Sequence, residues 1–460
     1  MDVRAVARFG EVHFGAAELG DARRTRRLVR AVNAMVQQPA GTLPDKFDDP
    51  AGLKGLYRLL SAPAVTHARV LEPARQYTLR RMAAVAGTVL VIHDWTELDY
   101  TGLRSLSEQL GQIGNGSGRG YLCANALAVV AETREALGLA YQKLARRPRV
   151  APGETRAARR DRIDRETRLW REASRHIPPP VPGRRQVEVA DRGADVLEFL
   201  DFMAVAGKSY LVRSKHNRRI LLENGEQTKL HDYARGLPAA AHRTVSVGAT
   251  AGRPAREARV AVAWAQVTLL VPQQPRGETR RVPLTTWVIC VREVEPPAGA
   301  EPLEWILLTD VPVETAADAA ERIGWYETRW VIEEFHKAVK TGCGVEMLQL
   351  TTEDRLQPAI AVLSVVATHL LALRDAGRSA DAATRPATAL FAARWVRLLS
   401  LWRYRDARPD LSVREFVLAL ARLGGHQNRK HDHPPGWLVL WRGWTKLQAM
   451  ADAASLLGIE

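Results

Sequence analysis

The 460-residue sequence predicts an α/β protein with helical ends. Short apolar runs rich in β-branched residues, such as Thr88–Ile92 and Gln186–Ala190, are typical of buried strands. Residues 220–304 mostly alternate apolar and polar side chains with a period of two, which indicates a β-rich block. Towards the two ends, residues 22–35 and 413–423 show the 3.6-residue period of helices. These patterns predict helical terminal parts around a mixed central part.

The composition favours a globular protein that binds a polyanion. Hydrophobic residues make up 46% of the chain and charged residues 25%, as in ordinary globular proteins. The formal net charge is +15, because 66 Lys and Arg outnumber 51 Asp and Glu. The electrostatic field of such a positive net charge attracts nucleic acid. A GC-rich genome that favours Arg everywhere is an alternative explanation for the excess of Arg. The position of the Arg residues has to decide between the two.

Neither a membrane span nor secretion is expected. The longest apolar stretch, Ile360–Leu373, is interrupted by polar residues and falls short of a span. Residues 1–14 lack the apolar region of a secretory signal. Cys123, Cys290 and Cys343 are too few and too far apart for a disulfide framework, so a reducing cytoplasm is the expected compartment.

A predicted helix near the N-terminus carries most of the clustered arginine. Asp21 precedes the helical pattern of residues 22–35, and the exposed side of this pattern is nearly all Arg. Arg23 and Arg27 share one face, and Arg24 flanks it. A merely solvated face would mix in Glu for pairing, so this helix is expected to contact DNA phosphates.

Two acids follow predicted strands. Asp94 comes just after the run Thr88–Ile92, and Asp191 follows Gln186–Ala190 directly. Each is expected at the C-terminal end of a strand. An Asp at a strand end is more often structural or a helix cap than catalytic, so these two positions do not identify a site by themselves.

One predicted helix gathers four functional side chains. At 100° per residue, Tyr326, Arg329, Glu333 and Lys340 fall in a sector about 60° wide. The neighbouring Glu334 points elsewhere, so the geometry selects Glu333. An exposed face on which Arg329 pairs with Glu333 is the alternative, and the apolar surroundings argue against it.

This set suits phosphodiester chemistry. Glu333 can hold a hard cation, while Arg329 and Lys340 bind phosphate oxygens and the phenol donates a hydrogen bond. One carboxylate cannot hold two Mg²⁺ ions, so Asp94 and Asp191 are the natural partners. Two ions about 4 Å apart can activate a nucleophile and stabilise the leaving oxygen.

The stretch Trp325–Gly344 resembles, at nearly every position, the signature of the insertion-sequence DDE transposases with a Tyr-Arg-Glu-Lys motif. That family includes the transposase of the composite kanamycin-resistance transposon. The family's first and second acids fall on Asp94 and Asp191. Leu19–Leu28 is similar to its amino-terminal DNA-binding segment. One departure lies at Tyr121–Asn125, where the family commonly carries a histidine.

The resemblance implies a ribonuclease-H-like catalytic core with a β-rich insertion. The expected parts are a helical N-terminal DNA-binding domain at 1–75, a catalytic domain at 76–375 with its insertion at about 220–304, and a helical C-terminal dimerisation domain at 376–460. It further implies that Trp305 stacks on a flipped-out base and that Arg213 and Lys215 clamp the same terminal phosphate. From the residues alone, a Trp that begins an apolar strand is usually core, and a solvated turn after a strand is the alternative for Arg213 and Lys215.

The implied reaction is cut-and-paste transposition. A nick at each transposon end, a DNA hairpin, hairpin opening and strand transfer into target DNA would take place in one site with two Mg²⁺ ions, for which Mn²⁺ would substitute. The partners would be double-stranded DNA at the inverted-repeat ends, target DNA and a second subunit in a homodimer. A catalytically silent DNA-binding repressor or architectural protein is the alternative, and a plain metal nuclease is a third.

Overall fold

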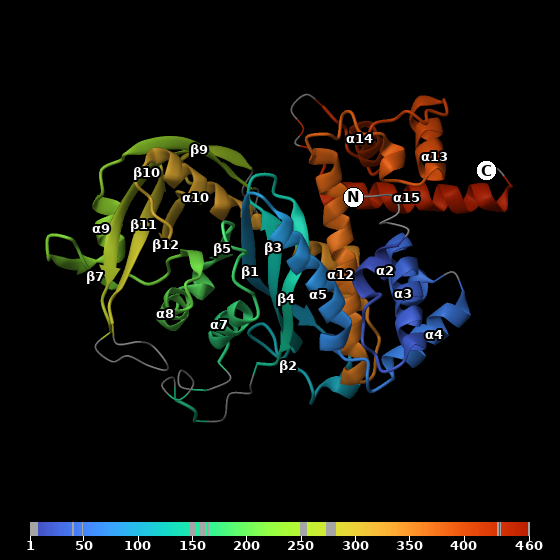
Figure 1. Cartoon of the computed structure of the whole chain (residues 1–460), viewed down its shortest axis with the longest axis horizontal. Helices are drawn as coiled ribbons and strands as arrows, with labels where there is room; N and C mark the ends of the chain where they lie inside the picture. The colour runs from blue at the N-terminus through green and yellow to red at the C-terminus, as the bar shows by residue number, and fades with distance from the viewer. Residues whose placement is uncertain are drawn as a thin grey trace. The chain divides into compact units, whose positions relative to one another are not determined.

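The computed structural model describes residues 8–38, 41–47, 49–147, 153–155, 158, 162, 165–248, 255–272, 282–429, 432 and 434–458. The chain folds into two units, each built from separate stretches. Unit 1 contains Met1–Val85, Trp95–Arg149 and Trp330–Glu460, and unit 2 contains Ala86–Asp94 and Val150–Arg329. Asp94 and Arg329 are therefore the last residues of the two stretches of unit 2. Figure 1 colours these stretches by position along the chain.

A sheet forms the centre of unit 2. Its strands run in the order β1, β5, β6, β12, β11, β10, β7, β8, and β9 also pairs with β10. The first three are parallel, and the others pair antiparallel. The bounds are β1 Thr88–Asp99, β5 Arg185–Ala190, β6 Ser209–Arg213, β7 Arg219–Leu221, β8 Gln227–Lys229, β9 Ala241–Val247, β10 Arg256–Leu269, β11 Leu284–Glu293 and β12 Glu304–Thr309.

The predicted end of the first strand needs correction. β1 does not end near Ile92 but continues to Asp99, so Asp94 lies within the strand, at the point where its pairing with β5 stops. β10 is a single strand of 14 residues within the predicted β-rich block. The strands of the β-rich block belong to the same sheet as β6. β10 pairs with β11 along ten residues, β11 pairs with β12, and β12 pairs with β6.

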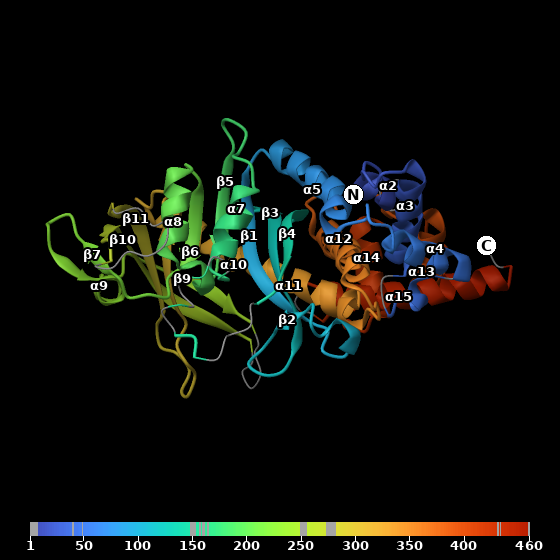
Figure 2. The ribbon, with the colours of Figure 1, turned by 90° about the horizontal axis from the view of Figure 1, so that it is seen from below.

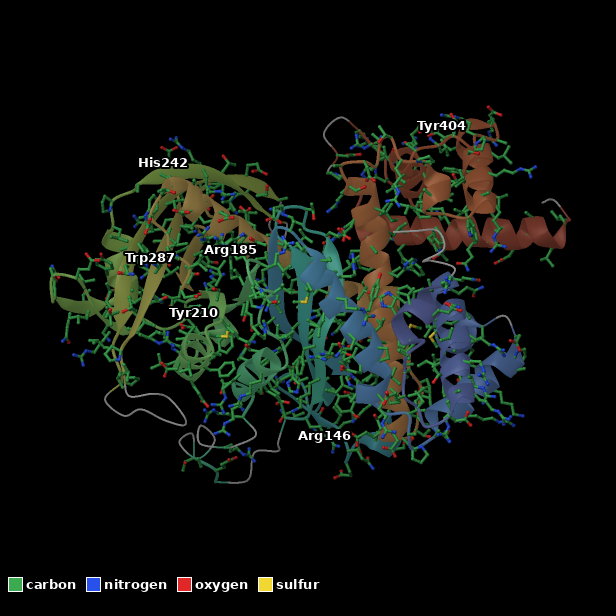
Figure 3. The ribbon with its side chains drawn as sticks, viewed as in Figure 1. Arg146, Arg185, Tyr210, His242, Trp287 and Tyr404 are labelled. Carbon is green, nitrogen blue, oxygen red and sulfur yellow. The ribbon has the colours of Figure 1, made fainter. Side chains whose placement is uncertain are left out.

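The helices of unit 2 are α7 (Arg168–Arg175), α8 (Leu197–Val205), α9 (Leu230–Gly236) and α10 (Ala316–Thr328). Helices α7 and α8 lie side by side in the views of Figure 1 and Figure 2. Tyr210 of β6, labelled in Figure 3, is fully buried, and its hydroxyl donates to Thr286 of β11 at 2.8 Å. This bond ties the parallel strands to the antiparallel ones.

Unit 1 is mostly helical, with strands β2 (Gly111–Gln112), β3 (Arg119–Val130) and β4 (Ala136–Ala145). Its α-helices are α2 Phe9–Phe14, α3 Ala22–Gln37, α4 Pro50–Leu60, α5 His67–Ala84, α11 Trp330–Lys337, α12 Glu353–Arg378, α13 Ala393–Tyr404, α14 Val413–Leu423 and α15 Trp437–Leu456. Shorter turns are η1 Pro44–Lys46, η2 Arg104–Leu106, η4 Ala338–Gly342, η5 Val345–Met347 and η6 Ala387–Ala389, and unit 2 has η3 Arg192–Ala194.

Local signals explain where the predicted helices begin. The Asp21 carboxylate accepts the Arg23 N–H at 2.7 Å and starts α3, which buries Leu28 and Val32. Ser412 and Glu415 cap α14 reciprocally, and this helix has the predicted bounds. The structure is thus mixed α/β with helices at both ends of the chain.

The apolar stretch near Ile360 belongs to α12. Among the described helices, α12 is the one long and apolar enough to cross a membrane, but 83% of its most apolar window is buried inside the protein. Such burial is typical of a central core helix, and helix α5 packs beside it (Figure 2). The division into 1–75, 76–375 and 376–460 stays a prediction, because the two units group residues by proximity rather than by role.

Candidate active site

Asp94 and Asp191 lie at the same level, just past the paired part of the parallel strands β1 and β5. Residues 88–93 of β1 pair with 185–190 of β5, ending at His93 opposite Ala190, and the two acids come next. Paired strands lie about 4.8 Å apart, so the two backbones stand one strand spacing from each other. One oxygen of Asp191 accepts the Gly193 N–H at 2.8 Å and caps the turn η3. Its other oxygen can serve a ligand.

Arg329 pairs with Asp94. Its Nη1 atom lies 2.9 Å from Asp94 Oδ2, and both side chains are mostly buried, at 14% and 15% exposure. The sequence suggested a phosphate or Glu333 as the partner of Arg329. The structure adds the first acid, Asp94, as a partner of this guanidinium.

Tyr326 sits at the centre of a cationic group. Burial raises the pKa of its hydroxyl, while the charges of Arg329 and Arg213 act to lower it and that of Asp191 to raise it. The pKa of Arg213 is in turn lowered, mainly by burial. Tyr326 is therefore a neutral hydrogen-bond donor held among charges that suit a phosphate.

Trp305 packs on Tyr326. The ring centroids are 5.1 Å apart and the planes meet at 68°, an edge-to-face contact. Trp305 is only half-buried, and Arg213 donates to the neighbouring Glu304 carbonyl at 2.7 Å. Trp305 is therefore not a simple core residue, because part of its side chain remains exposed beside the cations.

Asp195, which the sequence reasoning passed over, holds the basic turn after β6. This buried carboxylate accepts the backbone N–H groups of Lys215 at 2.6 Å and His216 at 2.8 Å. It also pairs with Arg218. The side chain of Lys215 is exposed, so Asp195 fixes the backbone and leaves the ammonium group available. The signal in the sequence was an acid four residues after Asp191.

A buried cluster of polar side chains connects β1 and β5 just before the two acids in each strand. His93 and Glu188 are 1% and 2% exposed, and His93 Nε2 lies 2.9 Å from Glu188 Oε2. Lys208 and Ser174 contact the other oxygen of Glu188 at 3.1 and 2.8 Å. Burial acts to raise the pKa of Glu188, but His93, Lys208 and Ser174 outweigh it and the pKa is lowered. The contact of His93 with Glu188 therefore adds a side-chain link to the backbone pairing of β1 with β5.

Glu333 and Lys340 belong to unit 1, and the helix that carries them is not continuous. Arg329 follows α10, Glu333 lies in α11, and Lys340 lies in a π-helical turn, η4. The prediction of one regular helix was therefore wrong, because the Cys343 N–H bonds to the Ala338 carbonyl five residues back and widens the turn. Lys340 pairs with Glu346 at 3.1 Å.

The arginines of α3 differ in exposure. Arg23 and Arg27 are exposed, whereas Arg24 is half-buried and donates to the Leu19 carbonyl at 2.9 Å. Arg23 and Arg27 can reach a phosphate, and Arg24 has a structural partner. The sequence grouped all three as DNA contacts.

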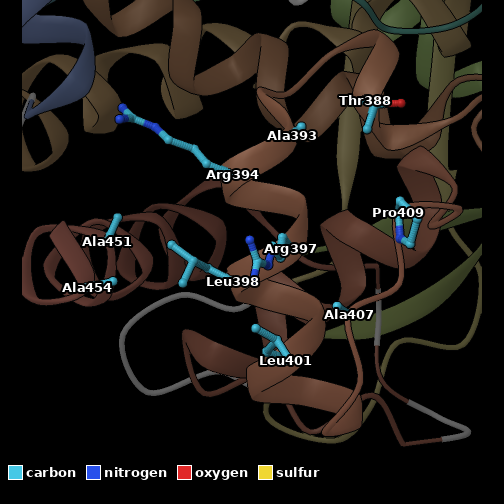
Figure 4. A pocket seen from close by; sticks show the side chains of 10 residues that line it. All are labelled: Thr388, Ala393, Arg394, Arg397, Leu398, Leu401, Ala407, Pro409, Ala451 and Ala454. Carbon is cyan, nitrogen blue, oxygen red and sulfur yellow. The ribbon is translucent and has the colours of Figure 1, made fainter. Parts of the chain in front are cut away.

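The C-terminal part of unit 1 contains an apolar groove of about 550 Å³. Figure 4 shows Leu398 and Leu401 of α13 and Ala451 and Ala454 of α15 at its wall, with Arg397 among them. Leu401 is 38% exposed. An exposed apolar wall of this kind favours contact with another protein surface.

Two family models match the chain. A model described as Transposase DNA-binding matches residues 7–65, which include α3 and its arginines. A model described as Transposase DDE domain matches residues 158–368, which include Asp191 and Glu333, while Asp94 precedes the matched region. The second match implies a ribonuclease-H-like fold.

Proposed function

We propose that this chain is an insertion-sequence DDE transposase that moves its element by cut and paste through a DNA hairpin. The observation that carries the proposal is that Asp94 and Asp191 directly follow the last paired residues of the parallel strands β1 and β5, with Tyr326 and Trp305 in the same unit. Nicking, hairpin formation, hairpin opening and strand transfer would use one site in succession.

Asp94, Asp191 and Glu333 would hold two Mg²⁺ ions, with Mn²⁺ as a substitute. Carboxylate oxygens are the ligands that hard cations prefer, and DDE domains generally use divalent metals. Asp94 and Asp191 fit this role because each directly follows the last residue that pairs β1 with β5, and Glu333 follows Arg329 by four residues. When bound, the ions supply activation of the attacking oxygen and charge stabilisation of the leaving oxygen.

The protein's own side chains would position the DNA end. Arg329, which pairs with Asp94, and Lys340 would turn to phosphate oxygens once cations compensate the carboxylates. Tyr326 would donate a hydrogen bond to the same phosphate. Arg213 and Lys215 would clamp the terminal phosphate, since both lie on the strand end and turn that Asp195 fixes.

Trp305 would stack on a base flipped out of the hairpin. Its edge-to-face contact with Tyr326 fixes the indole and leaves it only half-buried. Stacking on an aromatic side chain contributes roughly 1–3 kcal/mol per base, which offsets part of the strain of a tight hairpin.

The DNA and protein partners follow from the terminal parts of the chain. Arg23 and Arg27 of α3 would bind phosphates at the inverted-repeat ends. The apolar groove beside α13 and α15 supports a homodimer in the complex of two ends. We expect the protein in the bacterial cytoplasm, on the nucleoid when bound.

A catalytically silent DNA-binding protein is the second candidate. The observation that favours it is the ion pair of Arg329 with Asp94, because a neutralised carboxylate binds a cation less strongly. The two candidates differ in whether cations and DNA displace this arginine.

The deciding experiment incubates the full-length protein with end DNA of its own element and Mg²⁺, and follows nicks, hairpins and joined products. We expect all three in the wild type. Asp94→Asn should abolish cleavage and leave end binding intact. Asp99→Asn, a change to an exposed acid on the same strand, is the matched control and should cleave normally.

Two outcomes would count against the proposal. Tight end binding without cleavage under any metal condition would support the silent DNA-binding protein. Cleavage by Asp94→Asn would remove this acid from the catalytic set.

A further inference from the structure

A chain of buried polar side chains in unit 1 ends at His336, on the same helix as Glu333. His67 Nε2 lies 3.1 Å from Gln142 Oε1, and Gln142 Nε2 donates to Asn125 Oδ1 at 2.9 Å. Asn125 Nδ2 lies 3.2 Å from His336 Nε2. Asn125 is 2% exposed, and Gln142 and His336 are each 6% exposed. Because these side chains are buried, water does not replace their partners. Each hydrogen-bond donor in the series must therefore face an acceptor.

The direction of every bond in the chain is fixed by one backbone carbonyl. The Cys123 carbonyl can only accept, and it lies 3.2 Å from Asn125 Nδ2, so the amide nitrogen must face it. The two N–H groups of Asn125 then go to this carbonyl and to His336 Nε2. A flipped amide would set two acceptors against each other at Cys123.

The same constraint fixes the proton on the His336 ring. Because Nε2 accepts from Asn125, it carries no hydrogen, and the neutral ring is protonated at Nδ1. At the other end, Asn125 Oδ1 accepts from Gln142, so Gln142 Oε1 accepts from the N–H of His67. All four side chains agree with a single arrangement of hydrogens.

Glu333 lies three residues before His336 on α11. A carboxylate oxygen of Glu333 and a ring nitrogen of His336 are within 4.8 Å of each other. The ring therefore lies close to the carboxylate.

We propose that His336 is a positioning residue that orients the Glu333 carboxylate through its Nδ1–H and is itself kept from binding metal by Asn125. This rests on the proposed role of Glu333 as a metal ligand. Nε2 has its lone pair occupied and Nδ1 carries a hydrogen, so neither nitrogen can coordinate. The metal set then stays all-oxygen, which favours Mg²⁺ and Mn²⁺ over Zn²⁺, a cation that prefers imidazole.

The first test reads the tautomer directly. Full-length protein labelled with ¹⁵N histidine, without metal or DNA, should show a protonated-type signal at Nδ1 of His336 and an unprotonated-type signal at Nε2. The signal that disappears in His336→Asn identifies the residue. A ring protonated at Nε2 overturns the proposal. The NMR measurement does not depend on catalysis. A wrong tautomer can therefore be distinguished from a failure of the proposed function.

The second test concerns the metal. With Mn²⁺ bound, electron spin echo spectra should contain no ¹⁴N coupling from imidazole, and such a coupling would overturn the proposal. His336→Ala should raise the Mn²⁺ concentration for half-saturation by about 10- to 100-fold, as loss of an outer hydrogen bond to a ligand does. His336→Asn, which keeps an N–H near the position of Nδ1, should recover part of this loss. Equal affinity in wild type and His336→Ala would contradict the positioning role.

The third test reverses the hydrogen bond between residue 125 and His336. Asn125→Asp replaces the donor to His336 with an acceptor, so the ring should shift its hydrogen to Nε2 and leave a lone pair at Nδ1. We expect Zn²⁺ to bind this variant at least about 10-fold more tightly than the wild type. If the NMR signals show the shifted tautomer and Zn²⁺ affinity is unchanged, the selectivity argument is wrong. If the variant does not fold, the tautomer of the wild type still decides.

Discussion

Replacing Asp195 with alanine should destabilise unit 2 and release the basic turn that carries Lys215. The buried carboxylate accepts the N–H groups of Lys215 and His216 and pairs with Arg218, whose side chain is 13% exposed. Removing one partner of a buried ion pair costs about 3–5 kcal/mol, because the other charge stays desolvated. Asp195→Asn keeps one acceptor and should cost about 1–3 kcal/mol.

Urea unfolding followed by tryptophan fluorescence measures these changes in free energy. Hydrogen exchange adds a local reading, since the Lys215 and His216 amides should be protected in the wild type and exposed in Asp195→Ala. Asp232→Asn is the matched control. Asp232 is an exposed acid that contacts Asn217 of the same turn at 3.2 Å, and its loss should change stability by less than about 0.5 kcal/mol. A loss below 1 kcal/mol in Asp195→Ala, or continued amide protection, would refute the reasoning.

Three further outcomes are expected. Trp305→Ala should slow hairpin formation about 10- to 100-fold more than the first nick in a timed gel assay, with partial recovery in Trp305→Phe, and equal slowing of both steps would contradict stacking. Arg23→Ala and Arg27→Ala should each lower the slope of log affinity against log salt by about 1 in anisotropy titrations, whereas Arg24→Ala should lower it less, because that side chain already donates to a carbonyl. Burial lowers the pKa of His369 to about 4, so the unfolded chain binds a proton below about pH 6.5 while the folded chain does not. Stability should therefore fall by up to about 3 kcal/mol between pH 6.5 and pH 4, and less in His369→Phe; identical pH profiles of unfolding would contradict this.

The elements that the sequence predicted well are those with local causes. The β-branched run before Asp191 forms β5 and ends where expected. The helix α3 begins at its Asp21 cap and buries the predicted apolar stripe. Such features depend on residue type and spacing within about ten positions, and a sequence contains that information directly.

The errors share a different cause. The extension of β1 beyond Ile92 is set by which strands pair with it, and no apolar period marks its length. The break of the predicted helix at Arg329 and the π-helical turn before Cys343 arise from backbone bonding that a constant 100° rotation excludes. The constant 100° rotation therefore does not hold as far as Lys340.

The sequence by itself determined which chemistry the chain carries: strand-associated acids, an aromatic and cationic helix, and an arginine-rich N-terminal segment. Only the tertiary structure decided what each group contacts. Arg329 meets Asp94 across 235 positions, and Asn125 meets His336 across 211. Partners so far apart are chosen by strand register and by the need to satisfy buried donors and acceptors, and no local pattern encodes either.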